Sequence, residues 1–73
     1  MTLTELPAGS GARVTDVRGD SVVTRRLMEM GVIPGVAVEM IKAAPFGDPL
    51  EIRVRGYSLA IRRSEASVVD IAV

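Results

Sequence analysis

The side chains of this 73-residue chain that could do chemistry are carboxylates and arginines, because it contains no histidine and no cysteine. Histidine and cysteine are ligands that transition metals favour, and they supply many of the general bases and thiol nucleophiles of enzymes. The carboxylates weighed as metal ligands, besides those near the N-terminus, are Glu29, Glu39, Asp48, Glu51, Glu65 and Asp70. None of them shows the dense acidic spacing of a calcium loop. We therefore expect no enzyme activity, no cofactor and no tight metal site within the chain.

A second group with chemical potential is formed by the arginines Arg53, Arg55, Arg62 and Arg63. Alternation along two adjacent strands predicts Arg53, Arg55 and Arg62 on outward faces, where they would cluster. Such a cluster would suit an acidic protein surface or phosphate, and it motivates the hypothesis of a small RNA- or DNA-binding barrel. The simpler interpretation is a solvated sheet face with Glu51 as a cross-strand partner. Acidic and basic residues balance at nine each, and Tyr57 has inward parity, so we expect no nucleic-acid binding.

The segment from Leu27 to Gly35 combines flexible apolar side chains with turn residues. In a structural interpretation the methionines fill gaps, Gly31 ends a helix in the left-handed conformation, and Pro34–Gly35 makes a type II turn. In the alternative, the helix end presents side chains to a partner, because one helical face can bury only some of them and methionine adapts to binding surfaces. The partner-binding candidates of this segment are Met28, Met30, Val32, Ile33 and Pro34.

The segment Ala44–Pro49 is predicted to be a loop in which two prolines restrict the backbone and Gly47 allows a sharp bend. Phe46 lies between the prolines, at the predicted tip. It either folds back over one end of the domain or serves as an exposed anchor, since aromatic residues are favoured at interface hot spots. Phe46 and Asp48 are therefore further partner-binding candidates, beside Arg53, Arg55 and Arg62.

The elements that position these residues follow from periodicity. We expect a short turn near Leu3 and Leu6, a strand over 12–17, and a helix from about Ser21 to Met30. Asp20 or Ser21 caps this helix, whose buried face carries Val23, Leu27 and Met30. Alternation then predicts strands containing 36–40, 50–55, 57–62 and 68–73, with a single turn over 64–67. The expected turn glycines are Gly31, Gly35, Gly47 and Gly56, the last in a tight hairpin.

These elements predict a single mainly β domain over residues 1–73, a small barrel of about five strands with one short helix after the first strand. Only Phe46 and Tyr57 are aromatic, so the core is expected to be aliphatic. No apolar run approaches the roughly 20 residues needed to span a bilayer, and the N-terminus does not read as a signal peptide. We therefore expect a cytoplasmic protein that is not inserted in a membrane and acts by binding another protein.

An ordered set of motifs resembles the ferrous iron transport protein A (FeoA) family. The set consists of Leu27–Gly35 followed by a Val-rich strand, the loop Ala44–Pro49, then Gly56, Leu59–Arg62 and Glu65–Ala66 before a closing Val/Ile strand. The N-terminal spacing of Leu3, Leu6 and Gly9 fits as well. The resemblance covers essentially the whole chain and implies an SH3-like barrel.

The resemblance further implies an accessory protein of ferrous iron uptake that binds the cytosolic part of the FeoB membrane transporter. Because the favoured iron ligands are missing, its link with iron would be indirect, through the transporter. The alternative is a free-standing interaction or dimerisation domain for another partner, such as a metal-dependent repressor. A homodimer also stays open, because strand Val68–Val73 either pairs as an edge with a second copy or closes the barrel.

Overall fold

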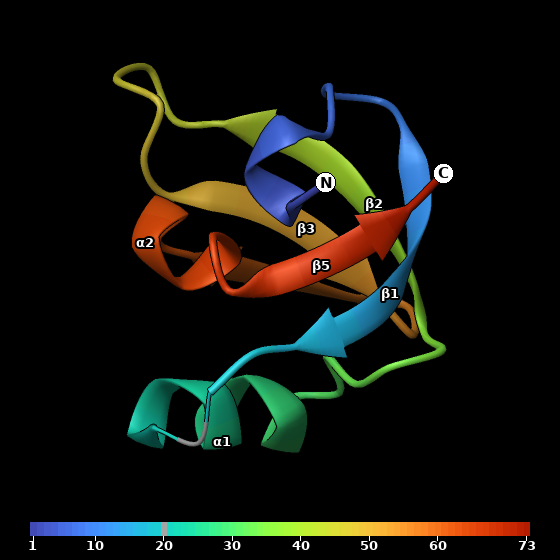
Figure 1. The fold of residues 1–73 in the computed structure, drawn as a ribbon. Coiled ribbons are helices and arrows are strands. Elements are labelled where there is room, and N and C mark those ends of the chain that lie inside the picture. The colour runs from blue at the N-terminus through green and yellow to red at the C-terminus, as the bar shows by residue number, and fades with distance from the viewer. Residues whose placement is uncertain (20) are drawn as a thin grey trace.

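The computed structural model describes residues 1–19 and 21–73, so Asp20, one of the two predicted capping residues, lies outside the described part. In chain order the elements are η1 (Leu3–Glu5), β1 (Gly11–Val17), α1 (Val22–Glu29), β2 (Ala37–Ala43), β3 (Leu50–Val54), β4 (Tyr57–Ile61), α2 (Arg63–Ala66) and β5 (Val69–Ala72). Figure 1 shows these elements along the chain. The predicted mainly β fold with a short helix after the first strand is confirmed.

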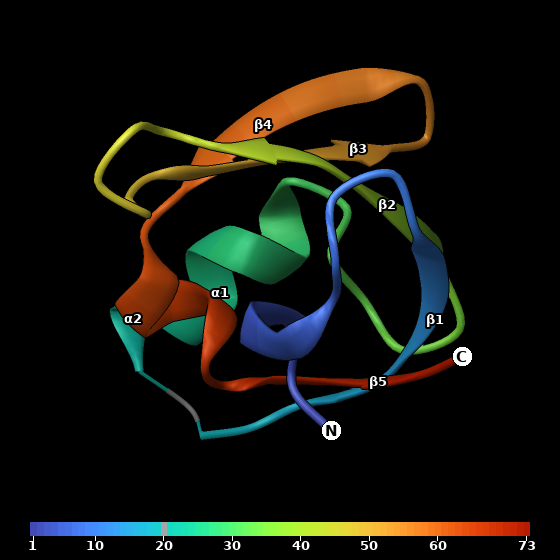
Figure 2. The same cartoon turned by 90° about the horizontal axis from the view of Figure 1, so that it is seen from above.

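Within the described residues, five antiparallel strands form one sheet in the order β4-β3-β2-β1-β5. The register shifts between Val14 and Asp16 in β1 and between Met40 and Lys42 in β2. Such irregularities increase local twist, which helps a short sheet to curl. Seen from above, η1 lies over one opening of the curled sheet and α1 below it (Figure 2). The two short helical segments therefore close the ends of the barrel.

The core is aliphatic, as predicted, because one face of each strand carries Val, Ile, Leu or Met. Burying each such side chain contributes about 1.5–3 kcal/mol to folding. Tyr57 is an exception to the predicted pattern: it lies opposite Val54 in the register, yet it is 68% exposed. Its position directly after a turn, on the outermost strand, leaves it beyond the packed interior. Val73 follows the end of β5 and is exposed for a similar reason.

Helix α1 begins at the predicted cap, because the Ser21 side chain accepts a hydrogen bond from the Thr24 N–H at 3.2 Å. Its buried face differs from the prediction: Thr24 and Leu27 are buried, whereas Val23 is 38% exposed. Burial of Thr24 is compatible with its polarity because its hydroxyl donates to the Arg18 carbonyl at 2.8 Å. This bond fixes which face of the helix meets the barrel.

The end of α1 has the geometry of a Schellman motif. The Gly31 N–H donates to the Met28 carbonyl and the Val32 N–H to the Leu27 carbonyl, both at 3.0 Å. Gly31 has a φ of +100°, the left-handed conformation that the sequence predicted at this position. The following type II turn is confirmed by the φ of +94° at Gly35 and the hydrogen bond from the Val36 N–H to the Ile33 carbonyl.

The connection in the β3–β4 hairpin is one residue longer than predicted, because β3 ends at Val54 and Arg55 joins Gly56 in the turn. Arg55 and Gly56 have φ values of +52° and +83°, which define a type I′ turn. The alternation of apolar and charged residues extends through Arg55, but the backbone reverses there. The assignment of Arg55 to the strand was therefore wrong.

Within residues 1–19 and 21–73, none of the helices has the length and apolar character needed to cross a membrane.

Candidate functional site

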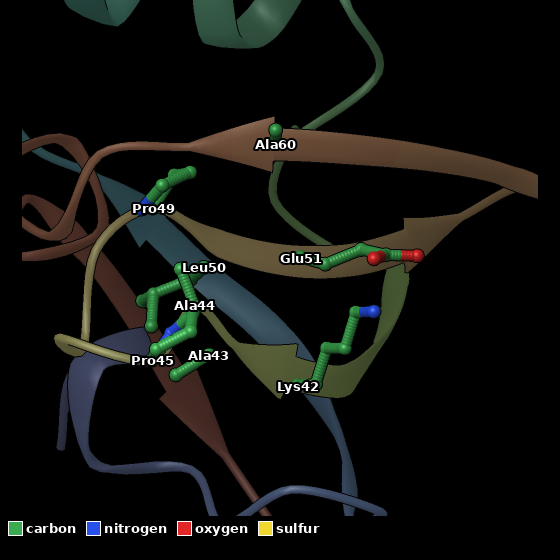
Figure 3. Close-up of a pocket in the computed structure, with 8 residues that line it drawn as sticks. All are labelled: Lys42, Ala43, Ala44, Pro45, Pro49, Leu50, Glu51 and Ala60. Atoms are coloured by element: carbon green, nitrogen blue, oxygen red, sulfur yellow. The ribbon is translucent and has the colours of Figure 1, made fainter.

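A hollow of about 490 Å³ lies at the base of the loop between β2 and β3. It is lined by Lys42, Ala43, Ala44, Pro45, Pro49, Leu50, Glu51 and Ala60. Figure 3 shows the prolines and Leu50 on one side, with the Lys42 ammonium and the Glu51 carboxylate together on the other. These two charged residues are direct partners in the β2–β3 register. The hollow is thus an apolar surface with one balanced pair of charges at its border.

The loop above this hollow presents Phe46 to solvent. Phe46 is 99% exposed, so the possibility that it folds back over the barrel is excluded. Two backbone bonds close the loop: the Gly47 N–H donates to the Ala44 carbonyl at 2.7 Å, and the Ala44 N–H donates to the Pro49 carbonyl at 2.9 Å. The left-handed φ of +85° at Gly47 permits this bend. An exposed aromatic ring at the tip of a closed loop can insert into a pocket of another protein.

Arg63, at the start of α2, holds this loop against the barrel. Its backbone N–H donates to Asp48 Oδ1 at 2.9 Å, and its Nε donates to the Gly47 carbonyl at 3.0 Å. The Asp48 carboxylate therefore satisfies an N–H of the first turn of α2, a position favourable for an acid. Asp48, a predicted partner-binding residue, is exposed but also has this structural role.

A second hollow, of about 320 Å³, borders the first and shares Pro49 and Ala60 with it. Its remaining lining residues are Arg26, Asp48, Arg62 and Glu65. Glu65 is buried and accepts a hydrogen bond from the Arg62 N–H at 2.7 Å, and it forms an ion pair with Arg26. With both oxygens engaged, this carboxylate ties the end of β4 to helix α1 rather than offering a free acid.

The candidates at the end of α1 separate into exposed and buried residues. Met28 and Pro34 are exposed, while Met30 and Ile33 are half-buried. Val32 is fully buried, so its assignment as a partner-binding residue was wrong. The Schellman motif explains this position, because its last residue packs against the helix residue five positions earlier, here Leu27, which is also fully buried.

The predicted arginine cluster on adjacent strands is wrong. Arg53 lies on β3 opposite Glu39 and Ser58, Arg55 lies in the turn, and Arg62 follows the end of β4. Because Leu50 pairs with Ile61, Arg62 is at the opposite end of the hairpin from Arg55. The arginines are therefore spread along the hairpin, with Arg55 at its turn end and Arg62 at the opposite end.

Across residues 1–19 and 21–73, no three or more Asp or Glu side chains are grouped so that they could hold a metal ion. Among these residues a pKa shift is resolved for Glu5. The Thr2 N–H donates to Glu5 Oε1 at 2.7 Å, and this bond lowers the pKa of the carboxyl below its usual value. Glu5 belongs to the N-terminal turn and lies outside both hollows.

Sequence reasoning missed the walls of the first hollow, above all the small residues Ala43, Ala44 and Ala60. The available signal was the run of two alanines before Pro45 and an alanine at an outward position of β4. Small side chains on neighbouring strands leave space at the surface, but only the register brings Ala60 beside Glu51. Among the predicted candidates, Asp48 and Arg62 line the second hollow, and Phe46 belongs to the loop above the first.

Comparison with known proteins matches residues 1–73 to the FeoA domain. A curated relative from Porphyromonas gingivalis, a fusion of Fe(2+) transport protein A with the Fe(2+) transporter FeoB, is 32% identical over 71 residues. The match covers 97% of this chain but 8% of that fusion protein.

Two solved structures are also similar. The solution structure of the FeoA protein from Chlorobium tepidum has a TM-score of 0.93 and 40% identity, over 100% of this chain and 70% of that one. The crystal structure of Stenotrophomonas maltophilia FeoA with zinc, described as a prokaryotic SH3 domain protein, has a TM-score of 0.85 and 37% identity, over 99% of this chain and 89% of that one. The chain therefore has an SH3-like fold and belongs to the FeoA family of accessory domains associated with ferrous iron transport.

Proposed function

We propose that this chain acts in the cytoplasm as a regulatory protein of ferrous iron uptake, by binding the cytosolic part of a FeoB-type transporter. The observation that carries the proposal is the Porphyromonas gingivalis relative, in which a segment similar to this chain belongs to the same polypeptide as FeoB. Fusion keeps two modules at high effective concentration, which is useful where the modules contact one another.

The surface that best suits such contact is the Phe46 loop with the apolar hollow at its base. An exposed aromatic side chain and an adjoining apolar depression are complementary features of a protein interface. Arg63 holds the loop through Gly47 and Asp48, so little ordering is needed when a partner arrives. The ring and the hollow together support a contact centred on this loop.

The iron itself is assigned to the transporter in this proposal. Zinc and ferrous iron are commonly held by histidine or cysteine in proteins, and the chain has neither residue. The chain would then affect transport through the contact with its partner rather than by carrying the ion.

The test is a binding measurement between this chain and the cytosolic part of FeoB from the same organism. Phe46→Ala is expected to weaken binding by about 30-fold or more, the effect of losing an interface hot spot. Val22→Ala is the matched control, since Val22 is also highly exposed but belongs to α1. Circular dichroism of both variants verifies that the fold is kept.

Absence of any association with the wild-type chain, together with normal iron uptake in a deletion strain, would contradict the proposed function. Association that Phe46→Ala leaves unchanged would retain the function but reject this loop as the contact. Binding to a metal-dependent repressor in place of the transporter would favour the alternative of an interaction domain for another partner.

A further inference from the structure

The outer side of β4 is an unprotected strand edge. Within the described residues β4 pairs only with β3, and it runs along the rim of the molecule (Figure 2). The strand Tyr57–Ile61 contains no charged residue, no proline and no glycine, and its pairing with β3 has no register shift. Charged residues, prolines and bulges that shift the register are devices with which proteins normally discourage pairing at an exposed edge. Their absence makes β4 a ready template for another strand.

The backbone groups that face outward can be identified from the turn. In the type I′ turn the Tyr57 N–H bonds to the Val54 carbonyl, and hydrogen-bonded pairs then alternate along an antiparallel ladder. Tyr57, Leu59 and Ile61 therefore bond to β3, whereas the N–H and C=O groups of Ser58 and Ala60 point away from it. Both residues are exposed, so an incoming strand could reach them.

Charge selects the occupant of this edge. At the turn end of β4, Arg53 lies opposite Glu39 in the register and Arg55 belongs to the turn, so this end carries two arginines and one carboxylate. Around the other end, the arginines Arg26, Arg62 and Arg63 outnumber the carboxylates Asp48 and Glu65. Between them, Glu51 is balanced by Lys42 in the register. The edge is thus uncharged along its length and positive at both ends.

A second copy of the chain fits this pattern poorly. If β4 paired with itself over its full length in antiparallel fashion, Tyr57 would lie opposite Ile61 of the other copy. The next residues would then bring Arg62 and Arg63 of one copy beside Gly56 and Arg55 of the other, at both ends. Opposed like charges destabilise such a pairing.

We propose that the edge of β4 binds an extended segment of a partner protein, uncharged over about five residues and flanked on both sides by carboxylates. The segment adds a sixth strand through the Ser58 and Ala60 backbone groups, and its acidic residues lie near Arg55 and Arg62. The inference holds for any partner with this chemistry and does not depend on the transporter.

The probe is a synthetic nonapeptide with five alternating threonines and valines between two pairs of glutamates, titrated into the isotopically labelled chain. The Ser58 and Ala60 amides are expected to shift and to gain protection from hydrogen exchange, while amides of β5 do not respond. Replacing the glutamates of the peptide by lysines should weaken binding by about tenfold or more. Added salt should lower the affinity of the chain for the acidic peptide.

A proline variant isolates the backbone contact. Ser58→Pro removes an outward N–H but leaves the ladder to β3 intact, the arrangement in which edge strands tolerate proline. Ser58→Thr keeps the N–H and serves as the control. We expect Ser58→Pro to weaken binding of the acidic peptide by about tenfold and Ser58→Thr to leave this binding unchanged.

Three results would overturn the inference. The first is an acidic peptide that leaves the Ser58 and Ala60 amides unperturbed up to its solubility limit. The second is equal binding of the peptide by Ser58→Pro and Ser58→Thr. The third is a concentration-dependent shift of these two amides without peptide, which would identify a second copy as the occupant.

Discussion

The two outer strands of the sheet differ in how their free edges are treated. Beyond β5, the N-terminal residues continue the ladder: Thr2 forms a bridge with Asp70, and the Ile71 N–H donates to the Met1 carbonyl at 2.9 Å. Beyond β4, the described part of the chain offers no comparable cover. The alternation over Val68–Val73 leaves open whether this strand pairs with a second copy or closes the barrel, and in the structure the N-terminal residues occupy its outer edge. The comparison locates the available edge on the opposite side of the barrel.

The largest expected effect comes from a substitution that disrupts the N-terminal residues covering the edge of β5. Leu3 lies in η1, is fully buried, and anchors the turn from which Thr2 reaches Asp70. Leu3→Ala should lower the free energy of unfolding by about 2–5 kcal/mol, the usual result of creating a cavity in a core. Urea denaturation measures the loss. Leu59→Ala, at a half-buried position of β4, is the control. An equal loss of unfolding free energy in this variant would contradict the distinction between the two edges.

The next effect concerns the tie between the end of β4 and helix α1. Glu65→Ala removes the acceptor of the Arg62 N–H and the partner of Arg26, so we expect a loss of about 1–3 kcal/mol in the free energy of unfolding. Hydrogen exchange should accelerate at Ile61 more than at Ile71. Arg26→Ala, which removes a largely exposed side chain, should cost less than about 1 kcal/mol. If Arg26→Ala lost more unfolding free energy than Glu65→Ala, that result would show that Glu65 contributes little by itself.

A smaller effect of opposite sign is expected at the turn of the open edge. Arg55 adopts a left-handed φ that is unfavourable for a residue with a Cβ, and asparagine followed by glycine suits a type I′ turn. Arg55→Asn should therefore raise the free energy of unfolding by about 0.5–1 kcal/mol while weakening the acidic peptide at β4. Arg53→Asn, on the neighbouring strand, should bring no such gain. Unchanged stability in Arg55→Asn would mean that the turn holds arginine without strain.

The smallest effect concerns pH and again separates the edges. The Thr2 N–H lowers the pKa of Glu5, so ionised Glu5 stabilises the N-terminal turn at pH values above the ordinary pKa of a glutamate. That contribution is lost as the pH falls through the lowered, folded-state pKa. Amide exchange at Ile71 should therefore accelerate relative to Ser58 as the pH falls below the ordinary pKa of a glutamate, once intrinsic rates are corrected. Glu5→Gln should abolish the difference, and a wild-type ratio independent of pH would refute this role.

The candidate site was predictable where a residue type restricts its own surroundings. Phe46 between two prolines, with Gly47 after it, could only be placed in a loop, and the structure has it at a loop tip. Met28, exposed beside buried Leu27, also follows from helical periodicity. Val32 and the arginines were misplaced because their positions depend on contacts made by the folded chain. Val32 is buried by the Schellman motif, and Arg55 is removed from the strand by the reversal of the backbone.

Local chemistry in the sequence by itself determined the order and type of the elements, the aliphatic core, the glycine turns and the absence of histidine and cysteine ligands. These features depend on neighbours a few residues apart, for which alternation, helical periodicity and glycine conformations are sufficient. Only the tertiary structure decided which edge is covered, where the two hollows lie and which arginines end up at the ends of β4. Those features depend on register and on contacts between distant segments, such as Met1 with Ile71 and Arg63 with Gly47, and no local pattern encodes them.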